Sequence, residues 1–335
     1  MFTRYIAIAV GIVGASTLLT ARPTPSQIPA INADFPDPAL LRAADGYFYV
    51  YGTQGRHGDH MDNIQIARSH DLTHWQVLHD ALPIKPSWAS RTQDFWAPHV
   101  SAHDGRYYLY YSAKPDVALT DNSRGLCLAV ATATRPEGPF TDTGKPLICG
   151  DGFVNIDPMA FDDPVTGKRL LYWGSGFKPI KVQELAPDRI SFVPGSAPLD
   201  LLATDPSDKP SNYRRLVEGA WVTRHNDWYY LFASGDNCCG PKAHYAVMVA
   251  RSRSALGPFD LVDPRHGGLV VAADARWLAP GHNSVVEDGK GRSWIAYHAV
   301  DRRRPRAAAS DELNTRRVMI VKRLYWQSGL PVIRP

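Results

Sequence analysis

The chain has 335 residues, of which 44% are hydrophobic and 21% are charged, an ordinary composition for a globular protein with a large core. Its 37 Lys and Arg residues against 33 Asp and Glu residues give a formal net charge of +4, too small an excess to indicate nucleic acid or an anionic membrane as a partner. The one basic cluster, residues 302–306, lacks interleaved aromatic residues and is interpreted as a solvated loop.

Residues 1–21 are predicted to be a secretory signal peptide. Arg4 precedes an apolar run from Tyr5 to Leu19, and small residues and prolines follow it. The run is short for a transmembrane helix, although an uncleaved anchor is the alternative. We therefore expect a secreted protein, extracellular or periplasmic, with a linker over residues 22–34, a single domain over residues 35–335 and no membrane contact after cleavage.

Export would permit disulfide bonds among the four cysteines of the chain. Cys127 and Cys149 could pair, whereas a bond between the adjacent Cys238 and Cys239 would be strained relative to the usual separation of bridged residues. The spacing fits no four-ligand zinc site. The sequence leaves the pairing open.

One pattern of short strands recurs five times through nearly all of the chain after the linker. Each unit has four strand-like segments with alternating Tyr, Trp and Val, separated by turns of Gly, Asp and Pro, and none has helical periodicity. At intervals of roughly 60 residues, the units place five residues at one matching point of the first strand: Asp37, Trp96, Asp157, Glu218 and His282. The pattern predicts an all-β fold, a five-bladed β-propeller.

The innermost strands of a propeller border its central channel, so these five side chains are expected to meet near the axis. Three carboxyls in one pocket, without a nucleophile elbow, a phosphate loop or an HExxH motif, indicate hydrolysis of an acetal such as a glycosidic bond. Glu218 has apolar neighbours that would raise its pKa, as a general acid requires. Taken alone, it would be interpreted as an exposed Glu at a strand end beside a Trp, and only the set of matching positions favours the acid. Asp37 suits the base that activates water, and Asp157 is expected to raise the pKa of Glu218 by its charge.

Other residues near the matching positions are candidates for substrate binding. Trp96 offers a flat face for stacking on a sugar ring. Asn155 and Asn283 could bond sugar hydroxyls, although turn and backbone roles are equally open. An insert rich in Pro, Asp and Ser, residues 197–213, is a candidate wall of the cleft.

Three short motifs resemble those of glycoside hydrolase family 43, the inverting five-bladed propeller enzymes that cut arabinan, arabinoxylan and xylo-oligosaccharides. PDP at residues 36–38 resembles the motif of the base, IDP at residues 156–158 that of the pKa-modulating Asp, and VEGAW at residues 217–221 that of the acid. The resemblance covers about residues 33–335. It implies Asp37 as base, Glu218 as acid and Asp157 as their third carboxylate.

The resemblance extends to three further segments. WAPHV at residues 96–100 is similar to the family's WAPDV, with His99 where an Asp is more usual. GHNSVV at residues 281–286 resembles the segment whose His, here His282, helps to hold a calcium ion or its waters. Arg317 matches a late Arg that approaches the substrate. The resemblance therefore implies a structural or site calcium ion and no organic cofactor.

The same resemblance suggests the substrate. The segment containing Cys238 and Cys239 is similar to the cysteine-paired segment of arabinan-acting members, and the chain ends directly after its fifth unit, whereas many β-xylosidases of the family carry an added β-sandwich domain. We therefore expect a monomeric α-L-arabinofuranosidase or arabinanase acting on a polysaccharide or oligosaccharide. A β-xylosidase is the first alternative, and a non-catalytic carbohydrate-binding propeller is the alternative of another class.

Overall fold

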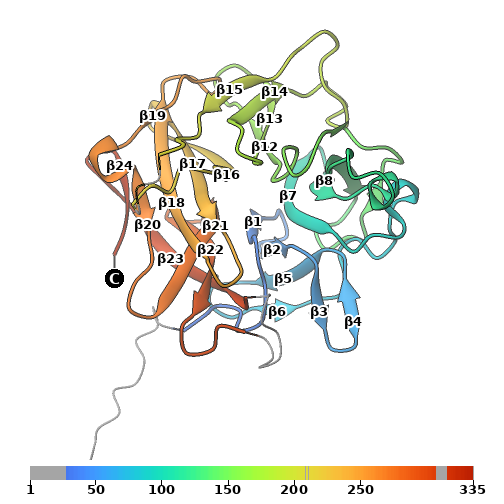
Figure 1. Cartoon of the computed structure of the whole chain (residues 1–335), viewed down its shortest axis with the longest axis horizontal. Coiled ribbons are helices and arrows are strands. Elements are labelled where there is room, and N and C mark those ends of the chain that lie inside the picture. Colours follow the sequence, from blue (N-terminus) through green and yellow to red (C-terminus); the bar gives the residue numbers. More distant parts are fainter. Residues whose placement is uncertain (1–27, 208, 210, 307–314, 335) are drawn as a thin grey trace, which may run out of the picture.

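A computed structural model of the chain describes residues 28–207, 209, 211–306 and 315–334. Five antiparallel sheets surround a central axis, and the first strand of each sheet lies nearest the centre (Figure 1). The prediction of an all-β, five-bladed β-propeller is confirmed. The predicted signal peptide and residues 22–27 of the predicted linker lie outside the described residues. Within the described ranges, no helix is long and apolar enough to cross a membrane.

The strands of each blade follow one another from the axis outward, in chain order. Blade 1 contains β1 (Ala39–Arg42), β2 (Phe48–Gly52), β5 (Gln65–Ser69) and β6 (Gln76–Val77). Blade 2 contains β7 (Phe95–His103), β8 (Arg106–Ala113), β9 (Cys127–Ala133) and β10 (Thr141–Asp142), with β11 (Ile148–Cys149) also paired to β9. Blade 3 contains β12 (Met159–Asp162), β13 (Arg169–Trp173), β14 (Ile180–Glu184) and β15 (Leu199–Leu202).

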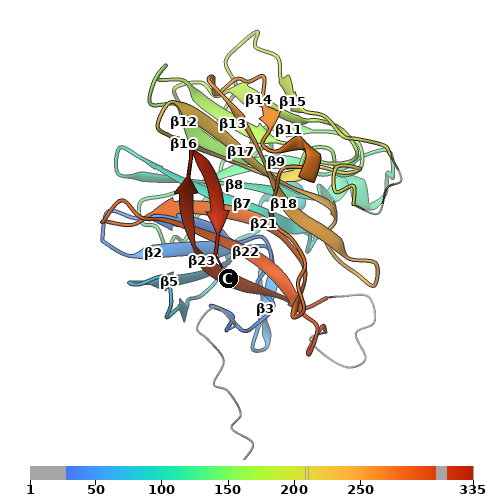
Figure 2. The same cartoon turned by 90° about the vertical axis from the view of Figure 1, so that its left-hand side faces the viewer.

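The last two blades have the longest strands. Blade 4 contains β16 (Glu218–His225), β17 (Trp228–Asn237), β18 (His244–Ser252) and β19 (Asp260–Leu261), with β20 (Leu269–Val271) also paired to β18. Blade 5 contains β21 (Trp277–Glu287), β22 (Ser293–Asp301), β23 (Arg317–Gln327) and β24 (Leu330–Ile333). The outer β23–β24 pair faces the viewer in Figure 2. A separate hairpin and three short 3-10 helices complete the described elements: β3 (Gly55–His57), β4 (His60–Asp62), η2 (Ser87–Ala89), η3 (Asp116–Leu119) and η4 (Pro264–His266).

The core is a set of apolar layers between neighbouring blades. Successive residues on each strand point to opposite faces of the sheet, so both faces of a blade can carry large apolar side chains. Between blades 2 and 3, for example, Tyr110 packs in one buried cluster with Leu171 and Trp173. These layers fix the angle between blades, and with it the positions of the inner strands at the axis.

The ring closes through contacts between the first described residues and blade 5. The backbone N–H of Ala30 donates to the carbonyl of Met319 at 2.8 Å, and that of Phe35 donates to the carbonyl of Arg317 at 2.8 Å. Residue 37 then follows at the axis, before β1. This closure brings Phe35 and Asp37 against Arg317, which lies 280 positions away from Asp37 in sequence.

The outer part of blade 3 differs from the prediction that residues 197–213 form a wall of the cleft. The outer strand of this blade is β15, and Phe192 makes only an isolated bridge with Leu185. The insert over residues 197–213 therefore supplies a strand to the outer edge of blade 3. None of its described residues lines the axial cleft, whereas Gly55, Arg56 and Met61 of the β3–β4 hairpin do.

Candidate active site

One backbone feature marks the axial end of every blade. Five residues there have left-handed φ angles, which are uncommon outside glycine: Asp37 (58°), Ala97 (47°), Asp157 (62°), Gly219 (60°) and His282 (50°). Two of the predicted matching positions are therefore displaced by one residue, because Trp96 and Glu218 each precede the equivalent point. The repeat interval could not reveal this offset, because the equivalence is one of backbone conformation.

A ring of hydrogen bonds between blades uses the N–H groups of these same residues. The N–H of Ala97 donates to Thr53 Oγ1 at 2.7 Å, and the N–H of Asp157 donates to Ser112 Oγ at 3.0 Å. On the far side of the ring, the acceptors for the N–H groups of His282 and Asp37 are Ser234 Oγ at 2.8 Å and His298 Nδ1 at 3.1 Å. Each bond fixes an axial residue against the second strand of the preceding blade, or against the residue directly after that strand.

The hydrogen bond at the junction between blades 3 and 4 differs from the others in the ring, and the difference allows Ser175 to bond to Glu218. Here the N–H of Gly219 donates to Asp157 Oδ2 at 3.0 Å instead of to Ser175. The hydroxyl of Ser175 is thus available to donate to Glu218 Oε2, at 2.5 Å. Gly219 suits this close approach, because a Cβ at this left-handed position would lie 3.2 Å from His282 Nδ1.

Asp37 lies among cationic and imidazole groups. Its Oδ1 is 3.4 Å from Arg317 Nη1, 3.4 Å from His282 Nδ1 and 3.2 Å from His298 Nδ1. Thr53 donates to its other oxygen, Oδ2, at 2.5 Å. Burial alone would raise the pKa of Asp37, but Arg317 and His282 hold that pKa well below its usual value. Asp37 is therefore ionised near neutral pH and can accept a proton.

Glu218 has the opposite electrostatic environment. Burial raises its pKa to about 7, although hydrogen bonds from Ser175 and Tyr245 favour the ionised form and oppose the rise. Tyr245 donates to Oε1 at 2.8 Å, so both carboxyl oxygens are held in place. A carboxyl that retains its proton near neutral pH can act as a general acid.

Asp157 is the third buried carboxyl. Its pKa is raised well above the usual value, first by burial and then by repulsion from Glu218 and Asp37. Since Asp157 and Glu218 repel each other within one buried site, the pair keeps a proton near neutral pH. Burial is the largest cause of the raised pKa of Glu218. A further rise caused by the charge of Asp157 stays a prediction.

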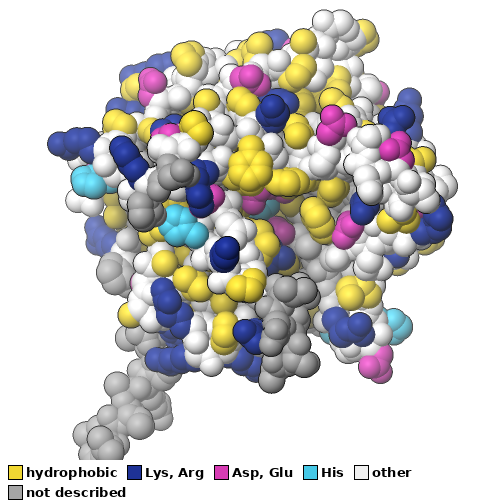
Figure 3. All heavy atoms as spheres, viewed as in Figure 1, with side chains coloured by type: hydrophobic (Ala, Val, Ile, Leu, Met, Phe, Trp, Pro, Cys, Tyr) yellow, Lys and Arg dark blue, Asp and Glu magenta, His cyan; other side chains and the backbone are white. Residues whose placement is uncertain are grey.

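These groups line one open cleft of about 1830 Å³ at the axis. The lining includes Asp37, Asp157 and Glu218, together with three other residues predicted for the site: Trp96, His282 and Arg317. Figure 3 shows acidic, hydrophobic and histidine side chains close together near the middle of one face, with Lys and Arg scattered around them. The cleft is large enough for several sugar rings, and its lining combines flat apolar side chains with charged groups, as sugar binding requires.

The structure does not bring Asn155 and Asn283 into this cleft. Asn155 is buried, and its Oδ1 accepts a hydrogen bond from Trp173 Nε1 at 3.0 Å, which gives it a role in holding the blade. Asn283 is buried beside His282 and is absent from the lining of the cleft. Asn283 directly follows His282 in β21, and adjacent residues in a strand point to opposite faces. Asn155 lies two residues before Asp157, outside the strands.

His99 is a packing residue. It is buried, its Nδ1 accepts from the N–H of Ala160 at 3.3 Å, and its ring makes an edge contact with Trp221 at 5.2 Å. Burial lowers its pKa to about 3, so it is a neutral imidazole.

The described residues at this site do not form a cluster of oxygen ligands for a calcium ion. Among the described residues, no group of three or more His, Cys, Asp or Glu side chains is placed to hold a metal ion. Two buried groups near His282 lack hydrogen-bond partners in the described part of the chain, namely His298 Nε2 and the amide of Asn283. Ca²⁺ prefers six to eight oxygen ligands, so these residues fit a calcium ion only through bridging water. The calcium ion stays a prediction.

Both cysteine pairs form disulfides. Cys127 bonds to Cys149, which joins β9 to β11, and the adjacent Cys238 and Cys239 are also bonded. The adjacent pair lines the cleft at the end of β17.

Sequence reasoning missed a set of positioning residues that share one sequence signal. Each lies in the second strand of its blade or within two residues after that strand, where a small hydroxyl or imidazole residue follows aromatic residues. The set is Thr53, Ser112, Ser175, Ser234 and His298. Tyr245 was also missed, because nothing in β18 distinguishes it from the core aromatic residues around it.

The family model for glycosyl hydrolases family 43 matches residues 26–331. The chain belongs to this family. It is therefore a glycosidase, and the sequence resemblance is confirmed. Three similar proteins illustrate the relationship. The extracellular exo-alpha-(1->5)-L-arabinofuranosidase of Cellvibrio japonicus is 27% identical over 292 residues, covering 81% of this chain and 80% of that protein.

The extracellular endo-alpha-(1->5)-L-arabinanase 1 of Bacillus subtilis is 27% identical over 316 residues, covering 90% of this chain and 88% of that protein. A solved structure, an exo-1,5-alpha-L-arabinanase from a bovine ruminal metagenomic library, superposes with a TM-score of 0.72 at 25% identity, covering 92% of this chain and 99% of the other.

Proposed function

We propose that this family 43 glycosidase is a secreted, inverting enzyme that cleaves α-L-arabinofuranosyl linkages in arabinan or arabinoxylan-type polysaccharides and oligosaccharides. One observation carries the mechanism: Asp37 and Glu218 line the same cleft, and their pKa values are shifted in opposite directions. Such a pair supplies one carboxylate as base and one carboxylic acid as proton donor. The similarity to arabinan-acting relatives, two of them named extracellular, supports the substrate and the secretion.

In the proposed reaction, Asp37 removes a proton from a water molecule as that water attacks the anomeric carbon. Glu218 gives its proton to the departing glycosidic oxygen on the opposite face of the sugar. Ser175 and Tyr245 orient the carboxyl of Glu218, and Arg317 keeps Asp37 ionised. Trp96 is proposed to contact the sugar, because its half-buried side chain lines the cleft.

Asp157 is proposed to position the acid rather than to react. Its Oδ2 accepts from the N–H of Gly219, the residue directly after Glu218, so it fixes the backbone that carries the acid. His282 lies 3.8 Å from Asp157 Oδ2 and 3.4 Å from Asp37 Oδ1, and it therefore spans the two carboxyls. A calcium ion bound through water near His282 would add positive charge beneath the cleft, and dialysis against a chelator, followed by assay and readdition of Ca²⁺, tests for it.

The test of the proposal combines a substrate panel with product stereochemistry. We expect the purified chain to hydrolyse an aryl α-L-arabinofuranoside or linear arabinan far faster than an aryl β-D-xyloside. Proton NMR of the first product should show the anomer opposite to that of the substrate. Faster cleavage of the xyloside would make the enzyme a β-xylosidase, a product with retained configuration would overturn the mechanism, and sugar binding without turnover would indicate a binding propeller.

A further inference from the structure

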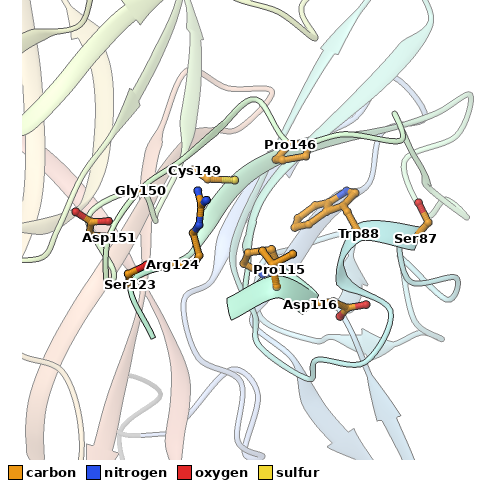
Figure 4. A pocket seen from close by; sticks show the side chains of 12 residues that line it. Ser87, Trp88, Pro115, Asp116, Ser123, Arg124, Pro146, Cys149, Gly150 and Asp151 are labelled. Carbon is orange, nitrogen blue, oxygen red and sulfur yellow. The ribbon is translucent and has the colours of Figure 1, made fainter. Parts of the chain in front are cut away.

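A second cavity lies in blade 2, outside the set of catalytic residues. This blade 2 pocket has a volume of about 710 Å³ and lies between η2, η3 and the segment over residues 146–151 (Figure 4). Its lining includes no histidine, and its two carboxylates are those of Asp116 and Asp151. Asp116, the first residue of η3, already accepts hydrogen bonds from the backbone N–H groups of Ser90 and Arg91. The blade 2 pocket is therefore equipped for binding and not for catalysis.

The pocket shares a wall with the catalytic cleft. Arg124 and Gly125 line both cavities. The wall consists of two paired chain segments, in which the N–H of Gly125 donates to the carbonyl of Gly150 at 2.6 Å and the N–H of Leu126 donates to that of Gly152 at 2.8 Å. The Cys127–Cys149 disulfide fastens the same two segments at the next position. A chain leaving the cleft across this wall would enter the pocket directly.

The chemistry of the pocket matches a sugar ring, which has apolar faces and a polar edge. Trp88 is half-buried, and its Nε1 donates to Asp142 at 3.2 Å, so the orientation of the indole is fixed. Figure 4 shows Trp88 and Pro146 on one side of the pocket and Asp151 on the other, with Arg124 between them. The Arg124 side chain is 66% exposed and able to bond hydroxyls. A flat aromatic surface beside such donors is a typical sugar platform.

We propose that the blade 2 pocket binds further sugar units of the same polysaccharide chain whose reacting bond lies in the catalytic cleft. The pocket would then favour long substrates over short ones, because only a chain that spans the shared wall can occupy both sites. This inference rests on the proposed function for the identity of the polysaccharide, but the existence of the site can be tested without turnover.

The test uses two matched substitutions within η3. Val117 lines the pocket and is 60% exposed, so Val117→Arg would fill the pocket without disturbing the core. Leu119 is 41% exposed, does not line the pocket and receives the same charge in the control variant Leu119→Arg. We expect Val117→Arg to lower kcat/KM on linear arabinan by about 3- to 10-fold, the loss of one aromatic stacking contact, and to leave the aryl arabinofuranoside unchanged. If the two variants have the same kcat/KM on linear arabinan, the proposal is overturned.

A binding measurement separates this inference from the proposed function. Each substitution is placed in the Glu218→Gln background and run in native gels that contain soluble arabinan, arabinoxylan or xylan. Slower migration of the Leu119→Arg protein than of the Val117→Arg protein in any of these gels supports the pocket, even if no arabinofuranoside is cleaved by the wild-type chain. Equal migration of the two in every gel overturns it. In the same background, Trp88→Ala should migrate as fast as Val117→Arg in the gels that contain polysaccharide. Trp88→Phe, which keeps a flat ring, should retain most of the retardation.

Discussion

The phenol of Tyr245 donates a hydrogen bond to Oε1 of Glu218 at 2.8 Å, and the ring that carries it is almost wholly buried. Tyr245 lies on β18 and Glu218 at the start of β16, two strands that are not neighbours in blade 4. The bond therefore crosses over β17 at the axis. It fixes the orientation of the proposed acid and lowers its pKa against the rise caused by burial.

Replacing Tyr245 by Phe should change the pH dependence of activity. The hydroxyl stabilises ionised Glu218, so its removal raises the pKa of the acid above about 7. Since the acid must be protonated, the alkaline limb of the kcat/KM profile should move to higher pH by up to about one unit. Tyr229→Phe is the matched control, because it removes a phenol that bonds to Asp163. An unmoved alkaline limb in Tyr245→Phe would contradict the assignment of Glu218 as acid.

Gly281→Ala should disturb the acid from a neighbouring blade. A Cβ at residue 281 would lie 1.9 Å from Cδ1 of Tyr245, so the buried ring must move. We expect a loss of about 1–3 kcal/mol in the free energy of unfolding, measured by urea denaturation, together with a lower kcat. In a Tyr245→Ala background the same change should lower the free energy of unfolding much less, because the ring with which the new Cβ clashes is absent. Additive losses in the double variant would rule out this cause.

Arg317→Met should move the acidic limb of the activity profile. Arg317 is the strongest of the groups that lower the pKa of Asp37, so its loss raises that pKa. A base must be ionised to act, and the acidic limb of kcat/KM should therefore shift to higher pH. Arg317→Lys keeps a positive charge and should shift the limb less. If Arg317→Met lowers activity equally at every pH, Arg317 acts on the substrate alone.

Glu218→Gln should abolish proton donation without unfolding the protein. We expect kcat to fall by about 10²–10⁴-fold on arabinan, where the departing oxygen needs a proton. The fall should be smaller on a dinitrophenyl arabinofuranoside, whose leaving group departs without one. Thermal unfolding of the variant checks that the fold is intact, and an equal loss on both substrates would count against the role of Glu218.

The sequence alone determined the architecture and the three carboxyls. Five units of alternating aromatic strands, each too small to bury its own faces, predict blades stacked around an axis, because every blade must cover its neighbours. The short segments around Asp37, Asp157 and Glu218 lie one to three blade lengths apart in sequence. Their carboxyls were therefore expected to lie close together at the axis. Strands, turns and repeats of this kind can be recognised in a sequence because they depend on residues that are close together in the chain.

Tertiary structure decided what those carboxyls do. The low pKa of Asp37 comes from Arg317 and His282, which the closure of the ring brings from the far end of the chain. Ser175 and Tyr245 reach Glu218 from other strands, and the one-residue offset at Trp96 and Glu218 appears only in the φ angles. Electrostatic shifts depend on burial and on charges within a few ångströms, whatever their distance in sequence. The sequence could therefore name the proposed acid and base, whereas only the fold could make one carboxyl retain a proton and the other lose it.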